Sequence, residues 1–328
     1  MQKKVIITGI AGQDGYFLAN LLHKKKYTVY GVAHGQSSSK IADIEKRLPF
    51  VHIFPGEITD ITFIVRLIKD IKPDEIYNLA AISHVGYSFK DPLTTIDVNV
   101  KGVLNILEAI RMTDNVKKIK FYQASTSEMF GGTEYNRPKK GYDESCLFHP
   151  RSPYGCAKLC AHWLVKNYRE SYGMYAVSGI LFNHESEMRG YEFVTRKITH
   201  AVARIKLGLD KYVELGNLDA KRDWGYAGDY VEGMYLMLQQ KKPDDYVLAT
   251  GETHSIKEFL SLAFKEIGIN DWKPYVKFNP AWMRPAEVDL LVGNPSKAIK
   301  ELKWKRKVNF KQLVKIMVEN DIKIESKI

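Results

Sequence analysis

Short apolar runs and longer amphipathic stretches alternate along residues 1–182 of the chain. A short apolar run bounded by turn-forming residues predicts a strand, whereas apolar residues at three- and four-residue spacing predict a helix. Strands are predicted at 4–8, 28–32, 51–54, 75–81, 120–124 and 176–182. Because strand and helix alternate at intervals of roughly 25 to 30 residues, the pattern predicts a parallel, doubly wound sheet with ligands at the carboxyl ends of its strands.

The helices between these strands are predicted from their apolar faces and from their ends. Asp60 is expected to cap a helix that Pro73 breaks. The side chains expected to face inward from that helix are Phe63, Ile64, Leu67, Ile68 and Ile71. The helix after Gly12 has apolar side chains at Phe17, Leu18, Leu21 and Leu22. Further helices are predicted at 99–111 and from Ser152 onwards.

Residues 183–328 are predicted to form a second, smaller α+β domain that binds the substrate. Helices are predicted at 191–207 and 229–238 and a strand at 246–250. The part near 225–250 is expected to return to the first domain, so the division into 1–182 and 183–328 is not a single cut. The chain is therefore expected to be an α/β protein. The residues expected in the core or between domains include the tryptophans Trp163, Trp224, Trp272, Trp282 and Trp304.

The composition is that of a globular protein with a sizeable core, since 45% of the 328 residues are apolar and 27% are charged. No apolar run reaches about 18 residues, and the start of the chain is too short for a signal peptide, so no membrane association is expected. The net charge is +11, but the lysines are scattered, which favours a solvated surface over a nucleic-acid groove. The three cysteines form no CxxC pair and no metal set, so we expect a cytoplasmic protein without a metal.

A glycine motif follows the first predicted strand. Gly9, Gly12 and Gly15 have the spacing G-x-x-G-x-x-G and lie between a strand and a helix. Glycines at these positions allow a tight turn and let backbone N–H groups approach a pyrophosphate at the helix N-terminus. The motif in this context predicts a dinucleotide site.

The end of the second strand, at residues 33–40, does not decide which dinucleotide binds. An acidic residue there favours NAD and arginines favour the 2′-phosphate of NADP, but this chain has neither. His34, Ser37 and Lys40 are able to hold a phosphate or to form an ordinary polar loop.

The stretch 120–158 carries the residues expected to do chemistry. Thr126 and Glu128 follow the strand at 120–124, and Tyr154 and Lys158 are four residues apart at the start of a helix. Residues four apart lie on one helix face. The Lys158 ammonium is therefore expected to lower the pKa of Tyr154, so that the tyrosine takes a proton from a sugar or alcohol hydroxyl near neutral pH.

These motifs together resemble those of the extended short-chain dehydrogenase/reductase superfamily, and five further blocks resemble the GDP-mannose 4,6-dehydratase family within it. The resemblance spans about residues 3–300. The blocks are Ser125-Thr126-Ser127-Glu128-Met129-Phe130-Gly131, Phe182-Asn183-His184-Glu185-Ser186, Phe193-Val194-Thr195-Arg196-Lys197-Ile198, Arg222-Asp223-Trp224-Gly225 and Arg284-Pro285-Ala286-Glu287-Val288-Asp289.

The resemblance implies a Rossmann-type fold and a hydride transfer within the sugar, with no net redox change. In that chemistry Tyr154 deprotonates the C4 hydroxyl, Thr126 hydrogen-bonds the C4 oxygen and Lys158 holds the nicotinamide ribose. A 4,6-dehydratase must also remove the C5 proton and protonate the leaving C6 hydroxyl, which requires an added acid–base group. Glu128 is that group in the resemblance.

The resemblance also assigns binding residues. Besides Tyr154 and Lys158, the cofactor contacts implied are Gly9, Gly12, Gln13, Asp14, Gly15, His34, Ser37, Glu57, Ile58, Leu79, Ala80, Ala81, Ser83, His184 and Arg189. The substrate contacts implied are Ser83, Ser127, Asn183, Val194, Lys197, Arg222, Arg284 and Glu287. Arg222 and Arg284 suit the substrate pyrophosphate, because guanidinium forks match phosphate oxygens. Glu287 is able to accept hydrogen bonds from guanine.

The chain departs from the family pattern in two places. Gly35 and Gln36 stand where the family has an Arg-Arg pair, which leaves NADP, the family cofactor, open to replacement by NAD. Glu187 and Met188 stand where the family has Pro-Arg near the sugar and cofactor. The expected protein is a GDP-sugar 4,6-dehydratase, most simply of GDP-mannose, that forms a homodimer or homotetramer.

Two alternatives stay open. One is an enzyme with the same chemistry on a related GDP-sugar such as a GDP-heptose, or an epimerase or reductase; Glu128 argues against a simple epimerase. The other is a non-catalytic dinucleotide-sensing or scaffold protein, against which the full set of Thr126, Glu128, Tyr154 and Lys158 argues.

Overall fold

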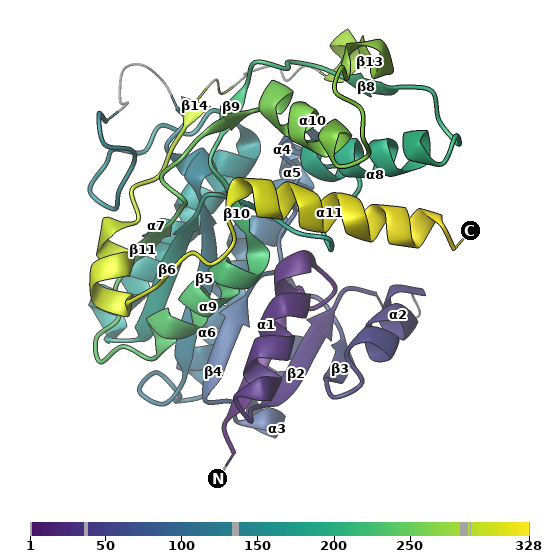
Figure 1. Cartoon of the computed structure of the whole chain (residues 1–328). Coiled ribbons are helices and arrows are strands. Elements are labelled where there is room, and N and C mark those ends of the chain that lie inside the picture. The colour runs from purple at the N-terminus through teal and green to yellow at the C-terminus, as the bar shows by residue number, and fades with distance from the viewer. Residues whose placement is uncertain (1, 36–38, 133–137, 283–287, 289, 328) are drawn as a thin grey trace.

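A seven-stranded parallel sheet forms the centre of the molecule (Figure 1). A computed structural model describes residues 2–35, 39–132, 138–282, 288 and 290–327. The strands lie in the order β3 (His52–Pro55), β2 (Thr28–Ala33), β1 (Lys4–Thr8), β4 (Glu75–Asn78), β5 (Lys120–Thr126), β6 (Tyr175–Leu181) and β11 (Tyr246–Leu248). The predicted fold class, an α/β protein with a doubly wound Rossmann-type sheet, is confirmed.

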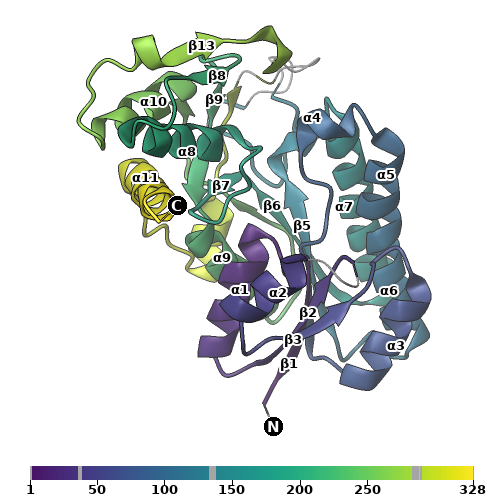
Figure 2. The ribbon, with the colours of Figure 1, turned by 90° about the vertical axis from the view of Figure 1, so that its right-hand side faces the viewer.

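Helices cover both faces of this sheet (Figure 2). On one face lie α1 (Gln13–Lys24), α2 (Ser39–Arg47) and α9 (Ala227–Leu238), and on the other α3 (Ile61–Ile71), α6 (Gly102–Met112) and α7 (Pro153–Tyr172). Each face has its own apolar core, with Leu18, Leu22 and Met234 in one and Ile68, Ile106 and Phe121 in the other. The burial of strands on both faces explains their nearly continuous apolar sequences.

Two predicted helix starts are confirmed by their capping bonds. The Asp60 carboxylate accepts hydrogen bonds from the Thr62 and Phe63 backbone N–H groups at the start of α3. The five apolar residues predicted to face inward from α3 are all buried. Ser152 caps α7 by accepting from the Gly155 N–H.

Two other predicted elements differ from the structure. β4 ends at Asn78, so 79–81 lie beyond the strand. The predicted single helix at 99–111 falls on a π-helical turn η1 (Asp97–Lys101) and on α6, and the short helix α5 (Pro92–Ile96) precedes them. In that turn the Asn99 side chain exchanges two hydrogen bonds with the Ile82 backbone, at 2.9 and 3.0 Å. π-helical turns of this kind commonly mark functional positions.

The rest of the chain forms a second region over the carboxyl ends of the main strands (Figures 1 and 2). Its core lies among α8 (Val194–Lys206), α10 (Ile256–Lys265) and α11 (Phe310–Glu325). The short strands beside them are β7 (Asn183–Glu185), β8 (Val213–Leu215), β9 (Lys221–Arg222), β10 (Trp224–Tyr226), β12 (His254–Ser255), β13 (Val276–Phe278) and β14 (Leu290–Leu291). The short helices are α4 (Val85–Ser88), η2 (Ser127–Met129), η4 (Lys273–Tyr275), η5 (Pro280–Trp282) and η6 (Ala298–Leu302).

The chain returns from this region to the main sheet at α9 and β11, and again at η6, whose Ala298 and Leu302 lie in the core of the α1 and α9 face. α9 packs against α1, and β11 pairs in parallel with β6 as the edge strand. Within the described residues, no helix combines the length and the apolar character needed to cross a membrane.

Candidate active site

A cavity of about 770 Å³ runs along the carboxyl ends of β1, β4, β5 and β6 and extends under the second region. Of the predicted cofactor residues, it is lined by Gly9, Gly12, Gln13, Asp14, Gly15, Leu79, Ala80, Ala81, Ser83, Tyr154, Lys158, His184 and Arg189. The remaining predicted residues in its wall are Thr126, Ser127, Glu128, Asn183, Val194, Lys197 and Arg222. Residues from distant parts of the sequence thus share one cavity.

The glycine turn at one end of the cavity leaves no room for side chains. Gly9 has a φ of +70°, and a Cβ on it would lie 2.8 Å from the Ala80 nitrogen. A Cβ on Gly15 would lie 2.6 Å from the Gly9 oxygen. The first turn of α1 is not capped by any side chain, so its N–H groups are left to bind an anion at the positive end of the helix dipole. This cradle fits the pyrophosphate of a dinucleotide.

The first turn of α1 is joined to β7 by a half-buried polar cluster. His184 Nε2 lies 2.8 Å from Asp14 Oδ2, and His184 Nδ1 lies 2.8 Å from the Phe182 carbonyl oxygen. Both ring nitrogens face acceptors, which favours the charged imidazolium. Burial opposes that charge, but the Asp14 carboxylate outweighs it and raises the pKa of His184. Burial likewise opposes ionisation of Asp14, yet His184 holds the pKa of Asp14 below its usual value.

The four residues predicted to be catalytic meet where β5 ends and α7 begins. Thr126 is the last residue of β5, Glu128 lies in η2, and Tyr154 and Lys158 lie in the first turns of α7. Each of the four is at most 8% exposed. The Thr126 hydroxyl accepts a hydrogen bond from the Glu128 N–H over 3.3 Å and is hydrogen-bonded to the Tyr154 phenol.

The predicted effect of Lys158 on Tyr154 is wrong in this structure. Burial raises the pKa of Tyr154 to about 12, the Glu128 carboxylate adds to the rise, and the Thr126 hydrogen bond and the Arg189 charge oppose it. Lys158 Nζ donates to the Ala124 carbonyl over 2.9 Å and lies 5.9 Å from the centre of the Tyr154 ring. Burial also lowers the pKa of Lys158 to about 8. The loss of hydration of both groups therefore outweighs their attraction.

Arg189 enters the cavity from the loop after β7. Its Nε lies 3.1 Å from Glu185 Oε2, and its guanidinium carbon lies 3.5 Å from the centre of the Phe193 ring. Glu185 is 2% exposed and also accepts from the Thr195 hydroxyl over 2.5 Å. Arg189 is thus a fixed positive charge on the side of the cavity that holds Tyr154.

The far end of the cavity is lined by the second region. Lys197 Nζ lies 3.3 Å from the centre of the Trp282 ring, and burial lowers the pKa of Lys197. Arg222 is 7% exposed, and its Nη1 donates to the Lys221 carbonyl over 2.9 Å. Two cationic side chains and a large aromatic ring at this end suit a nucleotide phosphate and base.

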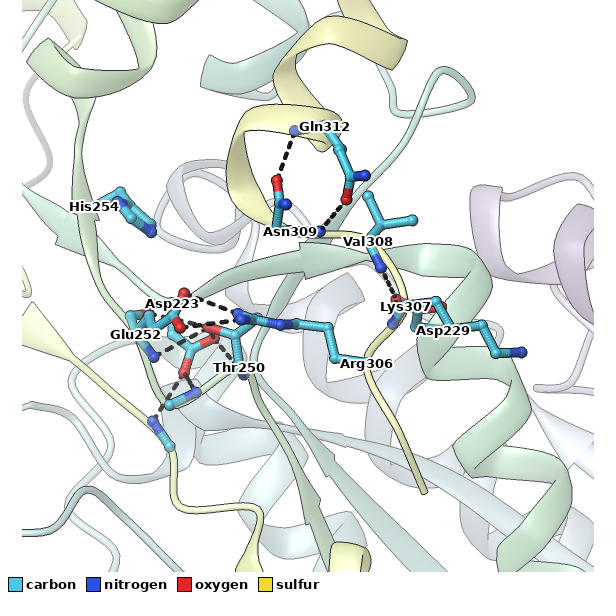
Figure 3. A network of polar contacts seen from close by, with 12 residues as sticks. Asp223, Asp229, Thr250, Glu252, His254, Arg306, Lys307, Val308, Asn309 and Gln312 are labelled. Carbon is cyan, nitrogen blue, oxygen red and sulfur yellow. Dashed lines mark hydrogen bonds and ion pairs between the residues drawn. The ribbon is translucent and has the colours of Figure 1, made fainter. Parts of the chain in front are cut away.

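Asp223, next to Arg222, gathers three chain segments at this end (Figure 3). Its carboxylate accepts from the Thr250 N–H at 2.8 Å, the Thr250 hydroxyl at 2.7 Å, the Gly251 N–H at 3.0 Å and the Gly293 N–H at 3.2 Å. Burial nevertheless raises its pKa to about 6. The network therefore holds β9, the chain after β11 and the chain after β14 together.

Three predicted cofactor residues lie outside the cavity wall. Ile58 is in the apolar core of the α3 and α6 face. His34 and Glu57 are exposed and lie next to each other, with His34 Nδ1 3.4 Å from Glu57 Oε1. Ser37, Arg284 and Glu287 fall outside the described residues.

Sequence reasoning missed part of the wall. The residues that it did not assign to the site include Val85, Gly86 and Tyr87 of α4, with Lys90, Glu192, Phe193, Gly216, Asn217 and Trp282. The tryptophan prediction is wrong for Trp163 and Trp282, which are 50% and 54% exposed. Residues 82–90 carry no sequence motif that would assign them to the cavity wall, because only the tertiary fold brings this segment to the edge of the sheet.

Comparisons with known proteins identify the family of this chain. A family model described as GDP-mannose 4,6 dehydratase matches residues 6–317. GDP-mannose 4,6 dehydratase 1 of Arabidopsis thaliana is 49% identical over 98% of this chain and 91% of its own length. GDP-mannose 4,6 dehydratase of Homo sapiens is 46% identical over 97% of this chain and 91% of its own.

Solved structures with the same fold include two UDP-glucose 4-epimerases. The Thermotoga maritima enzyme, solved with UDP-glucose, has a TM-score of 0.85 at 23% identity and covers 98% of this chain and 99% of its own. The Thermus thermophilus enzyme, solved with NAD, has a TM-score of 0.82 at 26% identity and covers 97% and 98%. With the family model and the two dehydratase relatives covering nearly the whole length, the chain belongs to the GDP-mannose 4,6-dehydratase family.

Proposed function

We propose that this protein is a 4,6-dehydratase that converts GDP-mannose to GDP-4-keto-6-deoxymannose and water. The observation that carries the proposal is the position of the Glu128 carboxylate, beside Thr126 and Tyr154 in a cavity that begins at an uncapped glycine cradle. An epimerase needs no such carboxylate, whereas the removal of water from C5 and C6 does.

A nicotinamide cofactor held by the N-terminus of α1, Arg189 and Lys158 would supply the hydride acceptor for C4 of the sugar and the hydride donor for C6. Tyr154 takes the proton of the C4 hydroxyl, and Thr126 orients the C4 oxygen. Once C4 is a ketone, the C5 proton is acidic, so Glu128 removes it and delivers it to the C6 oxygen, which leaves as water. The proton gained by Tyr154 balances the one that C5 regains, and the product differs from the substrate by one water.

The binding roles follow from the charges along the cavity. The N-terminus of α1 and Arg189 are proposed to hold the cofactor, and Lys158 its nicotinamide ribose. Lys197 and Arg222 are proposed to hold the GDP portion of the substrate, with Trp282 beside the base. Both the relatives named for GDP-mannose and the cationic far end of the cavity support this orientation.

The test is to incubate the protein with GDP-mannose and NADP and to follow the sugar nucleotide by mass spectrometry. Loss of one water, without net cofactor reduction, is expected. Other GDP-sugars, including a GDP-heptose, serve as competing substrates. A product isomeric with the substrate would instead identify an epimerase.

A further inference from the structure

A buried ion pair in the second region holds the loop of residues 187–189 on the side away from the cavity. Arg196 of α8 and Asp321 of α11 are 3% and 0% exposed, and Arg196 Nη2 lies 2.7 Å from Asp321 Oδ1. The other Asp321 oxygen accepts from the Thr199 hydroxyl over 2.6 Å. A buried pair of this kind is strongly destabilised when one partner is removed, because the other charge is left without a counter-ion.

The same guanidinium also binds the backbone of the loop. Arg196 Nη1 donates to the carbonyl oxygen of Glu187 and, over 3.2 Å, to that of Arg189. Its guanidinium carbon lies 4.7 Å from the centre of the Tyr191 ring. Asp321 therefore fixes Arg196, and Arg196 fixes the two carbonyls that bracket Met188.

The loop presents its charge on the opposite side. The Arg189 side chain lies in the cavity wall between Glu185 and Phe193 and acts on the electrostatics of Tyr154. The backbone carbonyl held by Arg196 and the guanidinium facing the site thus belong to one residue. If that carbonyl moves, the guanidinium in the cavity moves with it, because both belong to Arg189.

The packing of α8 on α11 does not depend on this pair alone. One turn further along, Glu325 of α11 accepts from His200 at 3.0 Å and from Arg204 at 2.8 Å. These two partners lie on α8, and the His200 ring packs edge-on against Tyr191 with ring centres 4.8 Å apart. Two polar links therefore join the same helices, and one of them reaches the cavity wall.

We propose that Asp321, acting through Arg196, is a positioning residue that holds Arg189 in place for cofactor binding and proton transfer. It touches neither ligand nor reacting atoms. The inference rests on the proposed function for the nature of the ligand, a dinucleotide with anionic phosphates. Asp321 on α11 contacts Arg196, Arg196 contacts the 187–189 loop, and the Arg189 side chain of that loop lines the cavity.

The decisive variants are Asp321→Asn, its matched control Glu325→Gln, Arg189→Met, and the double variant Asp321→Asn with Arg189→Met. Binding of NADP is measured by calorimetry, which needs no turnover. Asp321→Asn is expected to weaken NADP binding about tenfold, the scale of one charge-assisted hydrogen bond. Glu325→Gln is expected to lower the melting temperature but to change NADP affinity by less than about twofold.

The pH profile of turnover gives a readout that loosened packing does not move. The charged groups around Tyr154 are Asp14, Glu128, Lys158 and Arg189. Because the Arg189 charge opposes the rise in the pKa of Tyr154, displacing it should carry the rising part of the pH profile to higher pH, so that Asp321→Asn reaches a given rate only at a higher pH than the wild type. In Glu325→Gln the pH dependence of turnover should match that of the wild type.

The double variant decides whether the effect passes through Arg189. With Met at 189, Asp321→Asn is expected to weaken NADP binding by less than about twofold further, since coupled residues are not additive. Additive losses, or equal losses in Asp321→Asn and Glu325→Gln, would overturn the proposal. If Asp321→Asn does not fold, Arg196→Lys keeps the charge but loses the second nitrogen that lets Arg196 reach both Asp321 and the loop carbonyls, and unchanged NADP affinity in that variant would equally overturn the proposal. Because the titration requires no GDP-sugar, a failure of the proposed dehydration leaves this test intact.

Discussion

His184 and Asp14, 170 residues apart in the sequence, form a hydrogen-bonded ion pair of 2.8 Å that joins the second region to the first turn of the dinucleotide helix. The imidazole ring also stacks on Tyr230 at 4.6 Å. The pair places a positive charge beside the acidic residue of the phosphate cradle, so the Asp14 carboxylate is neutralised where an anion is expected to bind.

The stability that this pair contributes should depend on pH. The raised pKa of His184 means that its contribution is present at low pH and lost as the pH rises through that raised value. The lowered pKa of Asp14 means that its contribution is lost as the pH falls through the lowered value. Between those limits His184→Asn should lower the free energy of unfolding by about 2 kcal/mol. Urea titrations at several pH values test this, and a difference that does not shrink above the His184 pKa would contradict it.

Glu128→Gln should bind substrate and cofactor but stop the loss of water. The amide keeps the size of the carboxylate and cannot take the C5 proton. A loss of about 10² to 10⁴ in turnover is expected. Mass spectrometry follows the dehydration, and the absorbance of reduced nicotinamide reports whether the first hydride transfer survives. Dehydration at the wild-type rate would remove Glu128 from the mechanism.

Tyr154→Phe should abolish cofactor reduction itself, because the C4 proton then has no acceptor. In the wild type, burial raises the pKa of Tyr154 to about 12, so the rate of hydride transfer in stopped flow should keep rising with pH through the neutral range. A rate that levels off near neutrality would show that bound ligands bring this pKa down. Normal bound reduced cofactor in the Phe variant would assign the base to another residue.

The cofactor preference should be weak. The loop after β2 has no arginine among its residues 33–40, and the described His34 side chain lies next to the Glu57 carboxylate, which disfavours a phosphate nearby. Each charge-assisted hydrogen bond forfeited is worth about 1.5–3 kcal/mol. We expect NADP to bind with less than about a hundredfold preference over NAD, or roughly 2.7 kcal/mol.

Calorimetric titration of both cofactors checks this preference. Glu57→Gln should shift the ratio towards NADP, while Glu45→Gln, an exposed carboxylate on α2, serves as the control. A preference beyond about a thousandfold would mean that a complete phosphate site exists here.

Asp223→Asn should weaken GDP binding more than NADP binding. Asparagine keeps one acceptor oxygen but puts an NH₂ donor in place of the other, which cannot accept from the backbone N–H groups that meet it. The segments joined in Figure 3 would therefore separate around Arg222. A loss of GDP affinity of about tenfold, with a lower melting temperature, is expected. Asp219→Asn, at an exposed carboxylate three residues before Arg222, is the control. Equal losses for GDP and NADP would indicate general destabilisation.

Local sequence determined most of the helices and strands of the main sheet region. The α3 helix illustrates this, since its cap, its five buried residues and its end all follow from spacing and residue type, which act over one or two turns. The glycine turn and the Tyr154–Lys158 spacing are likewise local, and each predicts one wall of the cavity without reference to the rest of the chain. The π-helical turn at Asp97–Lys101 was not predicted, because the amide of Asn99 finds its partner at Ile82, outside the local pattern.

Only the tertiary structure decided the direction of the pKa shifts in the site and which residues line the far wall of the cavity. The sequence predicts a lowered pKa for Tyr154, but burial is a property of the whole fold, and desolvation exceeds the attraction of Lys158. The spacing within α8 and within α11 does not reveal that Arg196 and Asp321 meet, nor that Arg196 holds the Arg189 carbonyl. Helix and strand periods act over a few residues, whereas ion pairs and buried charges depend on which distant segments the packing brings within a few ångströms.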